Sequence, residues 1–128
     1  MHGLPPGLRA WPIAVGEDAE TVVALVRGAV ATSGTSRRSW TQDGIDRHHL
    51  VDPRTGEPAR SGLREVTIIA STCAQAEAAT KAVFVLGPRL GPGFAARSGV
   101  AARLATTAGR QISAGPWPQQ PQPRWLAA

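Results

Sequence analysis

The sequence predicts an α+β fold, in which a mostly antiparallel sheet is covered by a long helix at about residues 73–86. Three observations favour this class. Short β-branched runs are separated by turns rich in Gly and Pro, only one long segment has helical spacing, and strands and helices do not alternate strictly. The length of 128 residues fits one domain with its own core.

The first half of the chain predicts short strands. One is expected at residues 11–15, and residues 21–34 contain two β-rich runs that resemble a hairpin broken near Arg27 and Gly28. The pair Asp43-Gly44 is typical of a tight turn, so the flanking segments "RRSW" and "IDRHHLV" are expected to form a hairpin. The Pro and Gly content of "DPRTGEPARSG" predicts a loop.

In the second half, the clearest strand, at residues 64–71, leads into the clearest helix. Ser71 or Thr72 is a suitable N-cap, and Gly87 followed by Pro88 is expected to stop the helix. A short helix is expected at residues 93–100, followed by two strands within residues 101–115 that turn at Ala108-Gly109. The helical spacing predicts a core face made of Ala76, Ala79, Val83 and Leu86.

We expect the domain to occupy residues 11–118, after an irregular segment at residues 1–10 and before a Pro/Gln-rich tail at residues 119–128 that is expected to be disordered. The first residues lack the charged and apolar regions of a signal peptide, and no apolar run approaches the length of a membrane span. The chain as it stands is therefore expected to be cytoplasmic, without a membrane segment.

The formal net charge is +5, and the arginines that produce it are scattered along the sequence. No basic block interleaved with aromatic residues is present, so nucleic acid is not an expected partner. A local pocket for an anionic ligand fits this scatter better. Cys73 is the single cysteine, which excludes an intrachain disulfide and a cysteine cluster for metal.

Four ordered segments resemble the C-terminal half of the ApbE-type FAD:protein FMN transferases. They are "AVATSGTSRRSW", "HHLVDPRTGEPA", "LREVTIIASTCAQAEAATKAVFVLG" and "GVAARLATTAGRQISAGPWP". The second and third are the specific ones, because a His, two apolar residues and Asp-Pro-x-Thr-Gly-x-Pro are followed by a strand and an Ala-rich helix. The resemblance extends over nearly all of residues 11–118.

The resemblance implies a magnesium-dependent transferase that splits FAD at its pyrophosphate. Such enzymes attach FMN through a phosphoester to a Thr or Ser hydroxyl of a partner flavoprotein, and AMP leaves. Family members are about twice as long and often exported, and their N-terminal half supplies adenine and flavin contacts and one carbonyl ligand of the metal. Three origins therefore stay open: a truncated product, a gene fragment, or half of a split enzyme.

The resemblance places a catalytic base at His49, three residues before Asp52. The base would take the proton of the acceptor hydroxyl while its oxygen attacks phosphorus, a role that imidazole suits at neutral pH. His48 is expected to point to the opposite side of the strand and to be structural.

The turn after the histidines is expected to line the flavin site. Pro presets its φ, and Gly accepts conformations that other residues avoid. Arg54 is either a phosphate ligand, through its planar guanidinium, or a solvated loop arginine. The segment 31–34 would lie beside this turn with small side chains and backbone N–H groups. The candidate flavin-binding residues are Ser33, Gly34, Val51, Asp52, Arg54, Thr55 and Gly56.

The helix departs from the family pattern of an Asp and, four residues later, a Thr that help to hold magnesium. Here Glu77 and Lys81 occupy these positions, with Thr80 one residue early. Mg²⁺ prefers oxygen ligands, and an ammonium group cannot be one. Three alternatives follow: a plain i,i+4 ion pair, a weakened metal site at Glu77 and Thr80, or an ammonium that replaces part of the metal charge.

Two functions from different classes remain. The first is FAD:protein FMN transfer, by an enzyme or its truncated remnant. The alternative is a non-catalytic flavin-binding or partner-binding module that kept the fold and lost activity. The ordered motifs and His49 favour the first, whereas Lys81 and the shortness of the chain favour the second.

Overall fold

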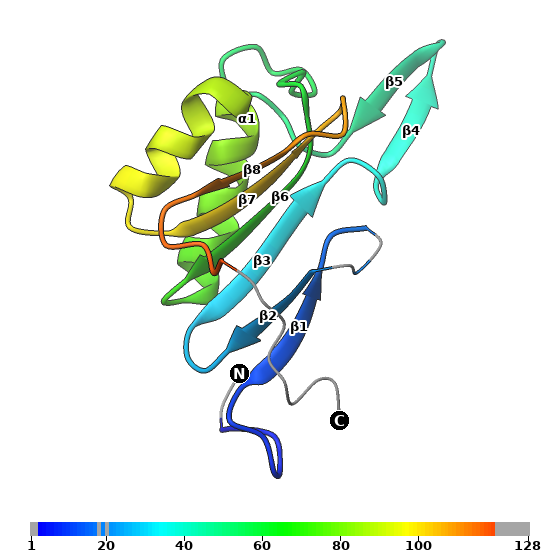
Figure 1. The fold of residues 1–128 in the computed structure, drawn as a ribbon. Helices are drawn as coiled ribbons and strands as arrows, with labels where there is room; N and C mark the ends of the chain where they lie inside the picture. Colours follow the sequence, from blue (N-terminus) through cyan, green and yellow to red (C-terminus); the bar gives the residue numbers. More distant parts are fainter. Residues whose placement is uncertain (1–2, 18, 20, 120–128) are drawn as a thin grey trace.

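A computed structural model describes residues 3–17, 19 and 21–119 of the chain. A central antiparallel sheet is covered on one face by a helix, and a separate β-hairpin lies on the other (Figure 1). This arrangement confirms the predicted α+β class. The elements in chain order are β1 (Trp11–Val15), β2 (Thr21–Leu25), β3 (Ala29–Gly34), β4 (Ser39–Gln42), β5 (Ile45–His48), β6 (Leu63–Ala70), α1 (Cys73–Arg97), β7 (Ala101–Thr106) and β8 (Gln111–Ala114).

The central sheet has the strand order β3-β6-β7-β8, which makes β3 an edge strand. The long strand β6 pairs with both β3 and β7, with Thr67 opposite Thr32 on one side and Arg103 on the other. The strands β7 and β8 form the hairpin predicted around Ala108-Gly109. In the segment 39–48, β4 and β5 also pair as predicted, with Asp43 (φ 53°) and Gly44 (φ 75°) in the turn.

The segment 21–34 corrects one prediction. Its two β-rich runs are strands, but they do not pair with each other, because β2 pairs with β1 and β3 pairs with β6. Gly28 (φ 103°) turns the chain from one layer into the other, and a Cβ there would lie 2.5 Å from the carbonyl oxygen of Ala70. The local pattern of alternating residues is the same for either pairing, so sequence alone did not separate them.

The helix α1 begins where the sequence predicts. Thr72 is its N-cap, and the side chain of Thr72 accepts a hydrogen bond from the backbone N–H of Gln75. Gly87 (φ 78°, ψ −176°) interrupts the helical backbone, as predicted, and helical structure then resumes and continues to Arg97. The short helix expected at residues 93–100 is therefore part of a longer second piece. Its start at Pro88 is favourable, because the first turn of a helix tolerates proline.

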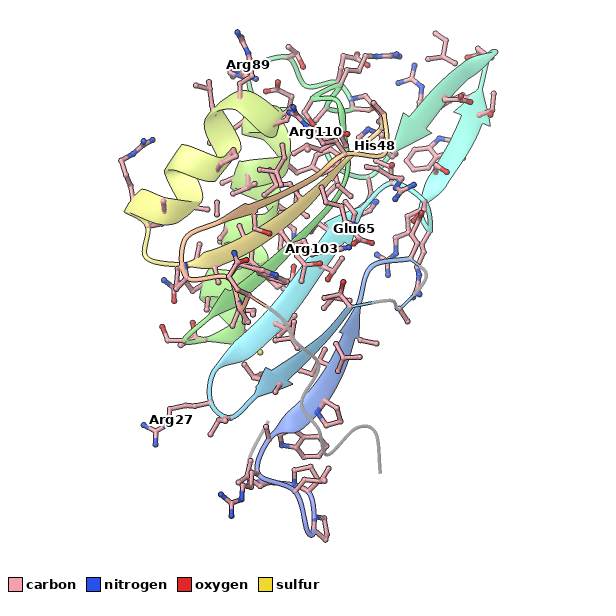
Figure 2. The ribbon with its side chains drawn as sticks, viewed as in Figure 1. Arg27, His48, Glu65, Arg89, Arg103 and Arg110 are labelled. Atoms are coloured by element: carbon pink, nitrogen blue, oxygen red, sulfur yellow. The ribbon has the colours of Figure 1, made fainter. Side chains whose placement is uncertain are left out.

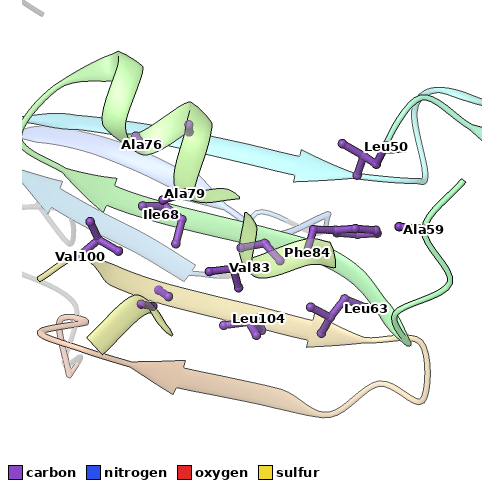
Figure 3. Packing of buried hydrophobic residues seen from close by; sticks show 14 of the residues in the cluster. Leu50, Ala59, Leu63, Ile68, Ala76, Ala79, Val83, Phe84, Val100 and Leu104 are labelled. Carbon is purple, nitrogen blue, oxygen red and sulfur yellow. The ribbon is translucent and has the colours of Figure 1, made fainter. Parts of the chain in front are cut away.

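The apolar core lies between α1 and the sheet (Figure 3). Ala76, Ala79 and Val83 are buried as predicted, whereas Leu86 is only half-buried. Phe84, which the predicted face omitted, is 1% exposed. Its ring packs edge-on against His48, at 6.0 Å between ring centroids.

The opposite face of the sheet is covered by the β1–β2 hairpin. Val15 and Val23 of the hairpin pack with Ala101 and Trp117, and with the half-buried Val30 and Ile69 of the sheet. Residues 3–10 contain no helix or strand, and the indole N–H of Trp11 donates to the carbonyl oxygen of Gly3 at 2.8 Å. The predicted disordered tail lies, from residue 120 onward, outside the described residues. Among the described helical residues, none form a helix long and apolar enough to cross a bilayer.

Candidate functional site

A cavity of about 540 Å³ opens along the edge strand β3. We call it the β3-edge cavity. It is bounded by the end of β1 and the following turn, by the C-terminal part of β3, by the loop at residues 36–38 and by one side of α1. The residues that matter for its chemistry are Glu17, Ser33, Gly34, Arg37, Arg38, His49, Glu65, Glu77 and Lys81.

The two neighbouring histidines lie in different surroundings. His49 is exposed and lines the β3-edge cavity, and its Nδ1 lies 3.4 Å from the carbonyl oxygen of Arg38. Since a carbonyl only accepts, a hydrogen bond at this contact uses a proton on Nδ1, and the neutral ring then has its lone pair on Nε2.

His48 is held by the backbone instead. Its Nε2–H donates to the carbonyl oxygen of Ala59 at 2.9 Å, and its Nδ1 accepts from the N–H of Leu50 at 3.2 Å. The edge-on contact with Phe84 fixes the ring from the core side. Both nitrogens of His48 are thus used in structure.

The buried hydroxyls of Ser33 and Thr80 join β3 to α1. Their oxygens are 2.7 Å apart, and Thr80 also donates to the carbonyl oxygen of Glu77 at 2.8 Å. Thr80 is fully buried and does not line the cavity, although Ser33 and Gly34 do. The Thr80 hydroxyl therefore connects helix and sheet in this structure.

Glu77 and Lys81 lie together at the cavity wall. The Lys81 ammonium contacts the Glu77 carboxylate and donates to the carbonyl oxygen of Glu77 at 3.3 Å. The two side chains are about half exposed, at 57% and 52%. The sequence allowed this i,i+4 pair as one of three alternatives, and the geometry shows that it forms.

The described residues do not fit a magnesium site. Among them, no group of three or more His, Cys, Asp or Glu side chains is placed to hold a metal ion. Glu77 is paired with Lys81, and the hydroxyl of Thr80 is turned into the protein. A cation with near-octahedral oxygen coordination would need more free oxygens than this wall offers.

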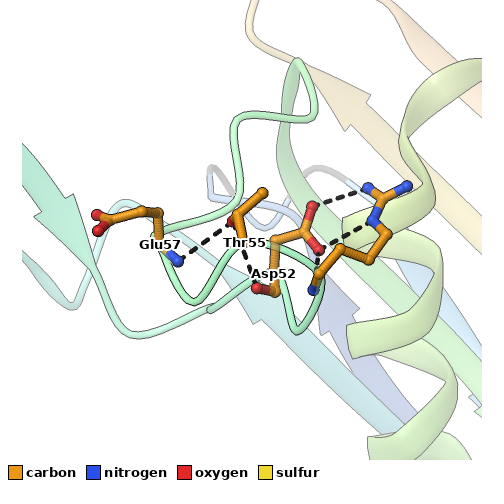
Figure 4. Close-up of polar contacts among 4 residues, drawn as sticks. Asp52, Thr55 and Glu57 are labelled. Carbon is orange, nitrogen blue, oxygen red and sulfur yellow. Dashed lines mark hydrogen bonds and ion pairs between the residues drawn. The ribbon is translucent and has the colours of Figure 1, made fainter.

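The turn at residues 52–57 is ordered by its own side chains (Figure 4). The Arg54 guanidinium donates to both carboxylate oxygens of Asp52, at 3.0 and 2.7 Å. These hydrogen bonds lower the pKa of the Asp52 carboxyl. The Thr55 hydroxyl accepts from the N–H of Glu57, and Gly56 takes a positive φ of 72°.

The structure separates the predicted flavin-binding residues into two groups. Ser33 and Gly34 line the β3-edge cavity with His49. The others lie outside its lining residues, and these are Val51, Asp52, Arg54, Thr55 and Gly56. Arg54 was expected to be either a phosphate ligand or a solvated loop arginine. Its side chain is 69% exposed and forms an ion pair with Asp52 at 2.7 Å, and its role as a phosphate ligand stays a prediction.

Sequence reasoning did not single out several charged residues in and around the cavity. Arg37 and Arg38 lie in the loop after β3, and Glu65 lies on β6. Arg103, only 6% exposed, reaches across the sheet to Glu65 at 3.7 Å (Figure 2). Burial raises the pKa of the Glu65 carboxyl, although Arg103 opposes this. The adjacent arginines after "TSG" were visible in sequence, whereas the Arg103–Glu65 pair depends on strand register.

The comparisons with known proteins agree with this fold. The profile of the ApbE family matches residues 1–104. The FAD:protein FMN transferase of Escherichia coli (strain K12) is 32% identical in an alignment of length 124 that covers 92% of this chain and 34% of that protein. The FAD:protein FMN transferase of Rhodobacter capsulatus is 36% identical in an alignment of length 115 that covers 86% of this chain and 22% of that protein.

Solved structures give the same result. The ApbE protein from Thermotoga maritima matches with a TM-score of 0.78 and 35% identity, over 88% of this chain and 38% of that chain. The Pseudomonas stutzeri flavinyl transferase ApbE, in its apo form, matches with a TM-score of 0.69 and 33% identity, over 82% of this chain and 35% of that chain. The matched part of the chain thus covers between 22% and 38% of the length of these relatives. On the family profile, the identity and the shared fold together, the chain belongs to the ApbE family.

Proposed function

We propose that this chain takes part in FAD:protein FMN transfer, moving FMN from FAD to a Thr or Ser hydroxyl of an acceptor flavoprotein and releasing AMP. The observation that carries the proposal is the position of His49. It lies on a cavity beside the small residues of β3, in a chain whose relatives are named as transferases of this kind.

The proposed role of His49 is that of a general base, and its contact with the Arg38 carbonyl supports this role. With Nδ1–H directed to the Arg38 carbonyl, Nε2 has the free lone pair that a general base needs. The acceptor oxygen would form a bond to the phosphorus of the FMN phosphate as its proton passes to Nε2. The bond from that phosphorus to the bridging oxygen would break, and AMP would leave with the bridging oxygen.

The proposed flavin site uses Ser33 and Gly34 in the cavity and, outside the cavity lining, the turn from Val51 to Gly56. Ser33 is held by Thr80, so a small and rigid wall faces any ligand in the cavity. In the turn, Asp52 accepts from both the guanidinium and the backbone N–H of Arg54, which supports the shape of the turn. The turn would therefore contribute its backbone and its shape.

A chimera tests this function. In the Escherichia coli relative, the segment that aligns with this chain would be replaced by the aligned residues of this chain. We expect the chimera, given FAD and an acceptor with its Thr or Ser, to form covalent FMN on the acceptor, detected by fluorescence in a denaturing gel. A chimera that folds and binds FAD but leaves the acceptor unmodified would contradict the proposal.

A second candidate function, a non-catalytic binding module, is favoured by the side of α1 that lines the cavity. Glu77 is paired with Lys81 and the described residues form no metal site, so the chain would fit a module that binds flavin or a partner without catalysis. The same chimera separates the two. Flavin binding with transfer supports the enzyme, and flavin binding without transfer supports the module.

A further inference from the structure

We propose that the β3-edge cavity binds a diphosphate group without a divalent cation, and that Arg37, Arg38 and Lys81 supply the positive charge. The inference rests on the proposed function, since the diphosphate of FAD is the ligand in view. It goes beyond that function by assigning the charge to three side chains of this chain.

The charge of the cavity is the first argument. Each of its three glutamates has a cation of its own, since Glu17 pairs with Arg64 at 3.3 Å, Glu65 with Arg103 at 3.7 Å, and Glu77 with Lys81. Arg64 and Arg103 do not line the cavity themselves.

The loop after β3 then adds two more cations. Arg37 and Arg38 are exposed and line the cavity, and neither has an ion-pair partner among the described residues. When the three ion pairs of the glutamates are set aside, the described cavity wall still has two guanidinium groups without an acidic partner. Such an excess favours a ligand with at least two negative charges.

The hydrogen-bond donors are the second argument. A guanidinium group presents its N–H groups in a fixed plane that matches two oxygens of one phosphate. An ammonium group has three N–H donors, and Glu77 receives two of those of Lys81. The third is left for an anionic ligand at the cavity wall.

The third argument is the poor fit of a metal at the same place. The ammonium of Lys81 lies on the Glu77 carboxylate, where a metal ion would have to bind, and like charges repel. The Thr80 hydroxyl is buried against Ser33 and cannot compensate without breaking that contact. A fixed ammonium therefore takes the place of the metal charge in this wall.

Calorimetric titration of the 128-residue chain with inorganic pyrophosphate tests the inference directly, in buffer freed of metal on a chelating resin. We expect saturable binding that millimolar magnesium leaves unchanged or weakens, because Mg²⁺ lowers the charge of the ligand. Absence of saturable binding would overturn the inference. So would an affinity that rises about tenfold or more when magnesium is added, a change of about 1.4 kcal/mol.

Single substitutions test which side chains supply the positive charge that binds pyrophosphate. We expect Arg37→Gln, Arg38→Gln and Lys81→Thr each to weaken metal-free binding about fivefold, the upper range for an exposed ionic contact. Lys81→Thr also frees Glu77, so magnesium should now strengthen binding. The matched control is Arg27→Gln, an exposed arginine between β2 and β3 that does not line the cavity, which should leave binding unchanged. Equal losses in all four variants would show a nonspecific charge effect and overturn the assignment.

The two proposals fail in different ways. If the chimera transfers FMN only with magnesium and pyrophosphate binding by the chain also requires magnesium, the function stands and this inference falls. If the chain binds pyrophosphate in metal-free buffer but the chimera transfers no FMN, this inference stands and the function falls.

Discussion

The two faces of the central sheet are built differently. Toward α1, the sheet presents Val66, Ile68 and Leu104, all fully buried against the helix. The face toward the β1–β2 hairpin has a smaller apolar cluster. It also has polar contacts, such as the hydrogen bond between Thr32 and Thr67 and the ion pair between Arg103 and Glu65. Apolar burial therefore stabilises the helix-covered face, whereas hydrogen bonds and ion pairs between neighbouring strands contribute much of the packing on the other face.

The candidate site lies where these two kinds of packing meet. The β3-edge cavity has the end of β1 on the hairpin side and Glu77 and Lys81 of α1 on the helix side. The edge strand between them is fixed to α1 through the Ser33–Thr80 contact. The apolar face therefore supports the edge strand, and the charged groups of the site lie outside the main core.

The largest effect is expected on the helix-covered face. Phe84→Ala should lower the free energy of unfolding by about 3–5 kcal/mol, because it leaves a cavity in the main core and removes the ring that contacts His48. Val23→Ala, in the hairpin-side cluster, should cost only about 2 kcal/mol. Urea unfolding followed by circular dichroism measures both. A Val23→Ala cost equal to or above that of Phe84→Ala would contradict the contrast between the faces.

The charged face has its own sensitive residue. Arg103→Met keeps much of the apolar stem but leaves Glu65, whose side chain is 12% exposed, without its cation. We expect a loss of about 2–3 kcal/mol at neutral pH, somewhat below the usual cost of breaking a fully buried pair, because the contact is long. The double variant Arg103→Met with Glu65→Gln should recover part of this loss. No recovery would mean that Arg103 acts through packing alone.

A smaller effect is expected from pH. The pKa of Glu65 is raised in the folded protein, mainly by burial, so the folded state holds this proton more tightly than the unfolded state. The contribution of Glu65 is then fully present below its ordinary value of 4.5 and is lost as pH rises through the folded pKa.

Comparing the wild type with Glu65→Gln isolates the contribution of the Glu65 carboxyl to the pH dependence of stability. Asp52, whose pKa is lowered, changes stability in the opposite sense and is present in both proteins. We expect the wild type to lose stability relative to Glu65→Gln as the pH rises from 4.5, in unfolding curves recorded at successive pH values. If the wild type instead becomes more stable relative to Glu65→Gln as the pH rises, the pKa of Glu65 is not raised in the folded protein.

Much of the fold could be predicted from sequence, because its signals are local. The Asp43-Gly44 turn, the cap at Thr72 and the break at Gly87 each depend on a residue and its nearest neighbours. The pairing of β2 and β3 could not be predicted, because a strand that alternates in polarity fits several partners.

The candidate site could be predicted only in part. The resemblance to the family pointed to five residues that line the cavity, which are Ser33, Gly34, His49, Glu77 and Lys81. The Arg103–Glu65 pair was missed, because these residues are far apart in sequence and meet only through the register of β6 and β7. One of the three alternatives made the Thr80 hydroxyl a metal ligand. In the structure this hydroxyl contacts Ser33, a partner that only the topology brings close.

The central claim is that His48 and His49, neighbours in sequence, serve structure and chemistry respectively. The direct test measures unfolding and FMN transfer for His48→Ala and His49→Ala in the chimera. We expect His49→Ala to reduce transfer by about 10²–10⁴-fold and to change the unfolding free energy by less than about 0.5 kcal/mol. His48→Ala, which loses its bonds to Ala59 and Leu50, should cost about 1–2 kcal/mol and retain most of the transfer. Equal losses of transfer in two folded variants would contradict the account.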